Sequence, residues 1–270
     1  MPVITKISAA KKKKDRFHIY VDRGKGDEYA LSVSEDLIVQ QQLWKGIEID
    51  EERINDLRDK DELDKAMQKA LNYLSYRMRS EVEIGRYLKE LEISEEEASS
   101  IVERLKELQF LDDAIFAQAF VRTKRDTQKK GPRLIEQELF QKGVEKKYIE
   151  EAMQQYTKEL QIDYAIKMVE KKQGSYKKEA HKKKEQKLIQ FLIQRGFHQE
   201  TALEAVHYAD VESDQDEELE AIAKQGEKAW KKYSEKDKWE RVQRTKKFLY
   251  GKGFSMGLIE NWLENKKNEE

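Results

Sequence analysis

A short pattern occurs four times in the sequence and limits the folds that the chain can adopt. Each copy places a leucine five residues before a final apolar residue, and the copies are YLKELEI (87–93), ELFQKGV (138–144), FLIQRGF (191–197) and FLYGKGF (248–254). In the last three copies a lysine or arginine and then a glycine precede the final residue. Glycine closes helices in the left-handed conformation, and a cation suits the negative end of the helix dipole. Because the copies recur at nearly even intervals along the chain, they predict an array of helical units.

Apolar residues on both sides of each turn complete the unit. After the turn, apolar residues stand at plus five in the last three copies and at plus nine in all four, which predicts one buried stripe of a following helix. Upstream, ALNYL (70–74), AQAFV (117–121), AIKMV (165–169) and GEKAW (226–230) predict an earlier helix. The expected fold is therefore mainly α: a tandem array of three-helix, helix-turn-helix-like repeats with boundaries at 63–112, 113–160, 161–210 and 211–270.

The N-terminal segment 1–62 is expected to form a β-rich extension followed by helix. Apolar residues alternate with polar ones over 17–21 and 29–33, and RGKGD lies between them, which predicts a β-hairpin. VITKISA (3–9) is a candidate third strand, so the extension is a hairpin or a small three-stranded sheet. Ser34 caps a short helix that Gly46 stops, and a longer helix is expected from about Asp50 to Met78, with a candidate interruption at Asp59–Asp61.

Composition agrees with a thin, repetitive core. Only 38% of the residues are hydrophobic whereas 40% are charged, which leaves little material for one large core. The net charge of -1 hides basic blocks at 1–26, 118–147 and 171–187 and acidic blocks at 91–113 and 209–220. Such blocks could present a positive stripe to a polyanion or could pair with each other on a solvated surface. The absence of cysteine and of long apolar runs favours the cytoplasm, with no membrane contact.

No catalytic, cofactor or metal site is expected. Asp112 and Asp113 stand side by side at the start of an apolar run, and we interpret them as helix caps because no histidine or further ligand is near in the sequence. The four histidines lack metal-ligand spacing, and no nucleotide-binding glycine loop is present. The tryptophans are expected to pack in the core: Trp44, Trp230, Trp239 and Trp262.

Several segments together resemble the RecX family of bacterial regulators of the recombinase RecA. They are ALNYLSYRMRSEVEIGRYL, LKELQFLDDAIFAQAFVRTKR and KKGPRLIEQELFQKGVEKKYIEEAM. The similarity is strongest over residues 66–156 and continues through the last two units, and the length resembles the long form of the family with an N-terminal extension. Glu92, where the other units have glycine, departs from the pattern, and so does the long polar run KKQGSYKKEAHKKKEQ of the third unit.

The resemblance implies a non-catalytic protein that binds RecA and its filament on single-stranded DNA. It implies a curved array that lies in the filament groove and mostly inhibits RecA ATPase, strand exchange and filament growth, in homologous recombination, DNA repair and the SOS response. We expect a monomer without a cofactor. Two alternatives remain open, which are a sequence-specific helix-turn-helix DNA-binding protein and a helical scaffold for protein interaction.

Cations of the first two units are the candidate contacts to DNA phosphates or to the filament. Lysine and arginine neutralise phosphates without reading sequence, so we expect nonspecific, salt-dependent contact. A solvated helix face is the alternative for every one of them. The candidates are Arg77, Arg79, Arg86, Arg122, Lys124, Arg125, Lys129, Lys130 and Arg133.

Overall fold

The protein is described here by a computed structural model covering residues 1–10, 15–176, 179–209 and 215–268. The chain divides into two compact units. Unit 1 comprises residues 1–116 with 142–144, and unit 2 comprises residues 117–141 with 145–270. The described residues are mainly helical, with one small sheet at the N-terminus, and so the predicted fold class is confirmed.

The N-terminal sheet has three antiparallel strands in the order β1 (Val3–Ala9), β2 (Arg16–Asp22) and β3 (Asp27–Ser34). Both the hairpin and the third strand are thus confirmed. The hairpin turn is closed by the carboxylate of Asp22, which accepts the backbone N–H groups of Gly24 and Gly26 at 2.6 and 3.0 Å. Both glycines have φ near +95°, a conformation that residues with a side chain seldom adopt.

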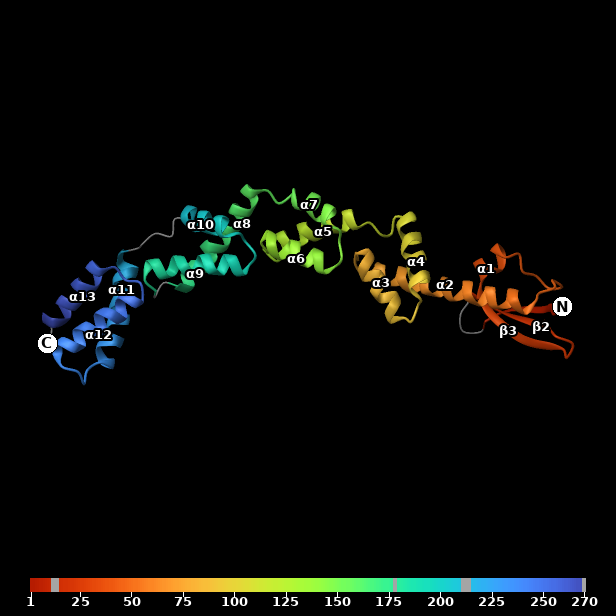
Figure 1. The fold of residues 1–270 in the computed structure, drawn as a ribbon, viewed down its shortest axis with the longest axis horizontal. Coiled ribbons are helices and arrows are strands. Elements are labelled where there is room, and N and C mark those ends of the chain that lie inside the picture. Colours follow the sequence, from red (N-terminus) through yellow and green to blue (C-terminus); the bar gives the residue numbers. More distant parts are fainter. Residues whose placement is uncertain (11–14, 177–178, 210–214, 269–270) are drawn as a thin grey trace. The chain divides into compact units, whose positions relative to one another are not determined.

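Two helices complete the N-terminal core. Helix α1 (Glu35–Gln40) is capped by Ser34, and α2 (Glu51–Ser75) is capped by Asp50. Apolar residues of the sheet and of both helices form one buried cluster that includes Ile19, Leu37 and Leu57. Figure 1 shows α2 running over the sheet, where it packs mainly against β3.

Helix α2 is continuous, so the interruption predicted at Asp59–Asp61 is wrong. The charged cluster that suggested a break contains a buried ion pair instead. Asp61 is 2% exposed, and its two carboxylate oxygens accept hydrogen bonds from the two terminal guanidinium nitrogens of Arg16 at 2.6 and 2.7 Å. Lys65, four residues along the helix, also pairs with Asp61 at 2.7 Å. Because Arg16 is 45 residues away in the sequence, local pattern could not show the buried pair with Arg16.

The rest of unit 1 is the first three-helix repeat. Helices α3 (Glu81–Glu90) and α4 (Glu95–Glu107) pack with the second half of α2 around Ala70, Ile84 and Leu105. Both α3 and α4 begin with a capping box in which a serine and a glutamate three residues later satisfy each other's backbone N–H groups. Helix α5 (Asp113–Asp126) starts in unit 1 and continues into unit 2.

Unit 2 contains the remaining helices, in sets of three. They are α6 (Pro132–Gln141) and α7 (Lys146–Met153) after α5; α8 (Lys158–Gln173), α9 (His181–Gln194) and α10 (Gln199–Tyr208), with a 3-10 turn at Gly174–Tyr176; and α11 (Gln215–Lys232), α12 (Lys238–Gly251) and α13 (Met256–Asn268). The leucines that aligned in the sequence are all fully buried: Leu88, Leu139, Leu192 and Leu249. The sequence repeat is therefore a repeat of core positions.

All four turns of the repeat take the left-handed conformation. The values of φ are 79°, 94° and 95° at Gly143, Gly196 and Gly253, and 63° at Glu92. Around Glu92 the N–H of Ile93 bonds to the carbonyl of Leu88 at 3.2 Å and the N–H of Glu92 to that of Lys89 at 3.0 Å, the hydrogen bonds of a Schellman motif. The first repeat has glutamate where the other repeats have glycine. It thus forms the same turn, at the cost of backbone strain.

Replacing Glu92 with glycine is expected to stabilise unit 1 by about 0.5 to 1 kcal/mol. The left-handed conformation costs a residue with a side chain roughly 1 to 2 kcal/mol, and the larger conformational freedom of unfolded glycine offsets part of the gain. Chemical denaturation measures the difference. Glu90→Gly, at the exposed last residue of α3 where φ is not positive, is the matched control and should not stabilise the unit, because glycine is a poorer helix former than glutamate; equal effects of both substitutions would contradict the role of φ.

The glycine turns also contact the start of the middle helix of the preceding repeat. The Ser80 hydroxyl, just before α3, donates to the carbonyl of Lys142 at 2.7 Å. One repeat further on, the N–H of Gly131, just before α6, donates to the carbonyl of Arg195 at 2.7 Å. A Cβ atom placed on Gly253 would be 3.7 Å from the backbone nitrogen of Lys183, near the start of α9. One type of contact therefore recurs between neighbouring repeats.

The tryptophans divide into two kinds. Trp230 is 2% exposed and meets Trp262 edge-on with ring centroids 6.3 Å apart, as the packing role requires. Trp44 and Trp239 are 57% and 73% exposed, so core packing was the wrong expectation for them. Each lies near an end of a helix rather than on its apolar face: Trp44 follows α1, and Trp239 is the second residue of α12.

Candidate nucleic-acid interface

The adjacent carboxylates Asp112 and Asp113 cap two different helices. Asp112 accepts the N–H of Ile115 at 2.9 Å and so caps its own helix, α5. Asp113 accepts the N–H of Glu81, the first residue of α3, also at 2.9 Å. The capping interpretation is confirmed, and Asp113 adds a tertiary link that the sequence did not reveal. Burial raises the pKa of Asp113 to about 6, although the Glu81 hydrogen bond opposes the shift.

Unit 1 is expected to gain about 1 kcal/mol of stability when the pH falls from 7 to 5. A carboxyl with a raised pKa in the folded state binds its proton more tightly there than in the unfolded state, where Asp titrates near pH 4, so folding is favoured as the pH falls through about 6. Denaturant titrations of the wild type and of Asp113→Asn at the two pH values measure this. Since the amide keeps an acceptor for Glu81 and does not titrate, the variant should lose this pH-dependent increment; the same increment in both proteins would contradict the assignment.

In the first repeat, two of the three candidate arginines have partners within the fold. Arg77 forms an ion pair with Glu83 at 2.8 Å, and Lys142 binds the same carboxylate at 2.8 Å. Burial alone would raise the pKa of Glu83, but the hydrogen bonds from Arg77, Lys142 and the Ser80 N–H lower it to about 2. The guanidinium of Arg79 lies 3.8 Å from the ring centroid of Tyr73, which itself stacks on Tyr87.

In the second repeat, two candidate lysines share one carboxylate. Lys124, on α5, and Lys130, in the following loop, both pair with Glu138 of α6, the first at 3.2 Å. Hydrogen bonds from both lysines lower the pKa of Glu138, outweighing the opposite effect of its burial. These lysines therefore join the first two helices of the repeat, which limits their freedom to contact a ligand.

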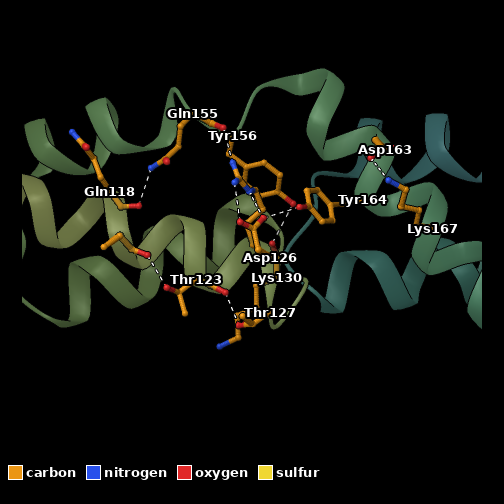
Figure 2. A network of polar contacts seen from close by, with 12 residues as sticks. Gln118, Thr123, Asp126, Thr127, Lys130, Gln155, Tyr156, Asp163, Tyr164 and Lys167 are labelled. Atoms are coloured by element: carbon orange, nitrogen blue, oxygen red, sulfur yellow. Dashed lines mark hydrogen bonds and ion pairs between the residues drawn. The ribbon is translucent and has the colours of Figure 1, made fainter. Parts of the chain in front are cut away.

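Arg125 and Lys129 contact a second network, in which Asp126, Gln155 and Tyr164 are labelled in Figure 2. Arg125 contacts both carboxylate oxygens of Asp126 at 2.7 and 3.0 Å and donates to the carbonyl of Gln155 at 2.9 Å. The Tyr164 hydroxyl, on α8, donates to Asp126 at 2.6 Å. These bonds from Arg125 and Tyr164 lower the pKa of Asp126 to about 2. Lys129 lies 4.5 Å from the ring centroid of Tyr164, so both cations take part in the contact between the second and third repeats.

Three candidates remain available for a partner. Arg86 of α3, Arg122 of α5 and Arg133 of α6 are exposed, and within the described part of the chain they have no ion pair. Sequence reasoning selected all nine cations by charge and position, and it missed the carboxylates that hold several of them. The acidic partners nearest in the sequence could have suggested pairs: Asp126 is adjacent to Arg125, and Glu83 follows Arg77 by six residues.

Other kinds of site find little support in the described residues. They contain no group of three or more histidine, aspartate or glutamate side chains arranged to hold a metal ion. None of the described helices combines the length and the apolar character needed to cross a bilayer. The structure does place exposed arginines on helices whose positions are held by ion pairs within the fold.

Comparison with known proteins identifies the family. Models of RecX domains match along the chain: the regulatory protein RecX N-terminal domain at 2–50, the first three-helix domain at 66–105 and the second at 112–153. The model of the third three-helix domain matches twice, at 159–206 and at 216–263. The chain belongs to the RecX family. The suspected resemblance is therefore confirmed, and the fourth repeat resembles a second copy of the third RecX domain.

Curated relatives match this chain over its full length. The regulatory protein RecX of Bacillus cytotoxicus is 37% identical over 269 residues, and that of Bacillus cereus strain AH820 is 36% identical over 269, with all of each chain covered. A crystal structure of regulatory protein RecX matches with a TM-score of 0.65 and 37% identity, covering 74% of this chain and 97% of that one. RecX from Lactobacillus salivarius matches with a TM-score of 0.54 and 32% identity, covering 56% and 99%. A regulatory role follows for this RecX chain.

Proposed function

We propose that this chain regulates RecA by binding its filament on single-stranded DNA, and that it mostly inhibits RecA ATPase, strand exchange and filament growth. Membership in the RecX family is the observation that carries this proposal. The chain would act in the cytoplasm, as a monomer and without a cofactor, in homologous recombination, DNA repair and the SOS response. Catalysis would belong to RecA, and the chain would change its rate through contact alone.

Arg86, Arg122 and Arg133 are the contacts that we favour among the nine candidates. All three are exposed and lie on helices, so binding a phosphate or a carboxylate would break no ion pair of the described fold. The other candidates take part in ion pairs, hydrogen bonds or ring contacts. A partner would have to compete with these interactions, and losing them would also loosen the repeats.

A triple substitution tests this role. Replacing Arg86, Arg122 and Arg133 with alanine should weaken binding to RecA filaments on fluorescein-labelled single-stranded DNA, followed by anisotropy at several salt concentrations. If all three contact phosphate, the slope of log affinity against log salt should become less steep by about 2, at roughly 0.7 per contact. Helicity should stay unchanged, since none of the three is buried.

The matched control removes the same charge elsewhere. The control lysines pair with acidic residues four positions away, and Lys146 and Lys167 are exposed whereas Lys60 is partly exposed. Their replacement should leave the slope near that of the wild type. An unchanged affinity of the arginine variant would reject the assigned contacts. Competition with random duplex DNA separates this proposal from a sequence-specific helix-turn-helix protein, which would keep a preferred duplex bound.

A further inference from the structure

The N-terminal sheet has one face that the helices leave open. Strand pairing puts Ile4, Ile7 and Ile19 on the side that packs with α1 and α2. The alternate residues of each strand face the opposite side of the sheet. Six central positions share this open face, namely Lys6 and Ser8 of β1, His18 and Tyr20 of β2, and Tyr29 and Ser32 of β3.

Three aromatic rings cluster on the open face. Tyr29 lies opposite Tyr20 in the strand register, and their ring centroids are 6.0 Å apart in an edge-to-face contact. His18 meets Tyr29 in the same manner at 5.7 Å. Although two rings contact it, Tyr29 remains 56% exposed. The neighbouring rings hold the Tyr29 ring in place, while more than half of its surface is available to a ligand.

The charge on this face suits an anionic ligand. Lys6 is exposed, and its ammonium lies 5.5 Å from the centroid of Tyr20. None of the six central positions is acidic. Asp22 and Asp27 lie at the hairpin end, and the Asp22 carboxylate accepts the N–H groups of the turn. Arg16 and Arg23 of the neighbouring described residues form ion pairs with Asp61 and with Glu28 and Glu51. Among the six central positions, Lys6 therefore supplies the positive charge.

We propose that this face binds single-stranded DNA by stacking unpaired bases on Tyr29 and Tyr20, with Lys6 contacting the backbone. Aromatic side chains beside cations on an open surface are the arrangement that sequence-tolerant single-strand binding requires, because every base has a flat face. A duplex keeps its bases stacked on each other and would gain no ring contact. This inference deepens the proposed function and rests on it for the source of the strand, which would be the DNA of a RecA filament.

The site can be tested without RecA. A fluorescein-labelled oligothymidylate is titrated with the full chain at several salt concentrations, and binding is followed by anisotropy. Tyr29→Ala should bind on the order of tenfold more weakly at every salt concentration, because the stacking of one base is lost. Since stacking releases no counterions, the salt slope should not change. Lys6→Ala should instead make the slope less steep by about 0.7.

Two further variants separate stacking from a general loss of structure. Tyr29→Phe keeps the ring and should bind within about twofold of the wild type. Tyr250→Ala removes a tyrosine that is 63% exposed on α12 and should have no effect. Circular dichroism should give each variant the thermal midpoint of the wild type, since Tyr29 lies outside the core.

Three results would overturn the proposal: wild-type affinity in Tyr29→Ala, an equal loss in Tyr29→Phe, or an equal loss of duplex binding. Failure here is distinguishable from failure of the proposed function. If RecA responds to the chain but Tyr29→Ala binds the oligonucleotide normally, only the sheet site is wrong. If Tyr29-dependent binding is present but RecA does not respond, the regulatory proposal is wrong and the sheet site remains.

Discussion

Replacing Gly143 with alanine is expected to lower the free energy of unfolding of unit 1 by about 3 kcal/mol. The residue has φ of 79°, which costs alanine roughly 1 to 2 kcal/mol. In addition, a Cβ atom there would lie 2.4 and 2.6 Å from Cγ2 and Cβ of Val82, and overpacking of this kind costs about 1 to 3 kcal/mol. The Ser80–Lys142 hydrogen bond lies beside this contact and should weaken with it. Chemical denaturation of the full chain measures the loss.

A second substitution separates the two causes. Val82→Ala removes the two methyl groups that the new Cβ would meet, so the double variant should recover part of the steric cost but none of the cost of φ. Gly85→Ala is the matched control, since nothing lies within 4 Å of a Cβ at that position of α3; it should be neutral or stabilise by up to about 1 kcal/mol. Strictly additive effects of Gly143→Ala and Val82→Ala would contradict the predicted contact.

Replacing Gly131 with alanine should cost about 3 kcal/mol for a different reason. Its φ is not positive, but an added Cβ would lie 2.2 Å from the carbonyl carbon of Gly196 and 2.3 Å from the nitrogen of Phe197. These are backbone atoms, so the two repeats must move apart, and the hydrogen bond from Gly131 to the Arg195 carbonyl at 2.7 Å would be lost. Hydrogen exchange should show the loss of protection at α6 and at the turn around Gly196.

No side-chain truncation should rescue Gly131→Ala, in contrast to Gly143→Ala. The control in unit 2 is Gly257→Ala, where a Cβ on α13 meets nothing within 4 Å and stability should not fall. Wild-type stability of Gly131→Ala would mean that the second and third repeats do not approach as closely as the structure shows.

The repeat itself could be predicted from the sequence because it is a pattern of local signals. Helix caps, apolar spacing and the glycine turns each depend on residues within a few positions of each other. The aligned positions, such as Leu139 and Phe197, are accordingly buried. The same holds for the hairpin and for the capping role of Asp112.

Features that depend on distant residues were not predictable. Gly131 stands outside the repeated pattern, yet a Cβ there would meet the backbone of Gly196, in the next repeat along the chain. The carboxylates of Glu83 and Asp61 contact cations 59 and 45 residues away. Charge pattern therefore selected a set of candidate cations, but only the fold could separate the exposed arginines from those with partners.

The most direct test of the central claim is the DNA-dependent ATPase activity of RecA on single-stranded DNA, followed while the full chain is added up to a one-to-one ratio. We predict that the rate falls with added wild-type chain and falls less with the variant in which Arg86, Arg122 and Arg133 are alanine. A rate that does not change at stoichiometric wild-type chain would contradict the assignment of this protein as a regulator of RecA.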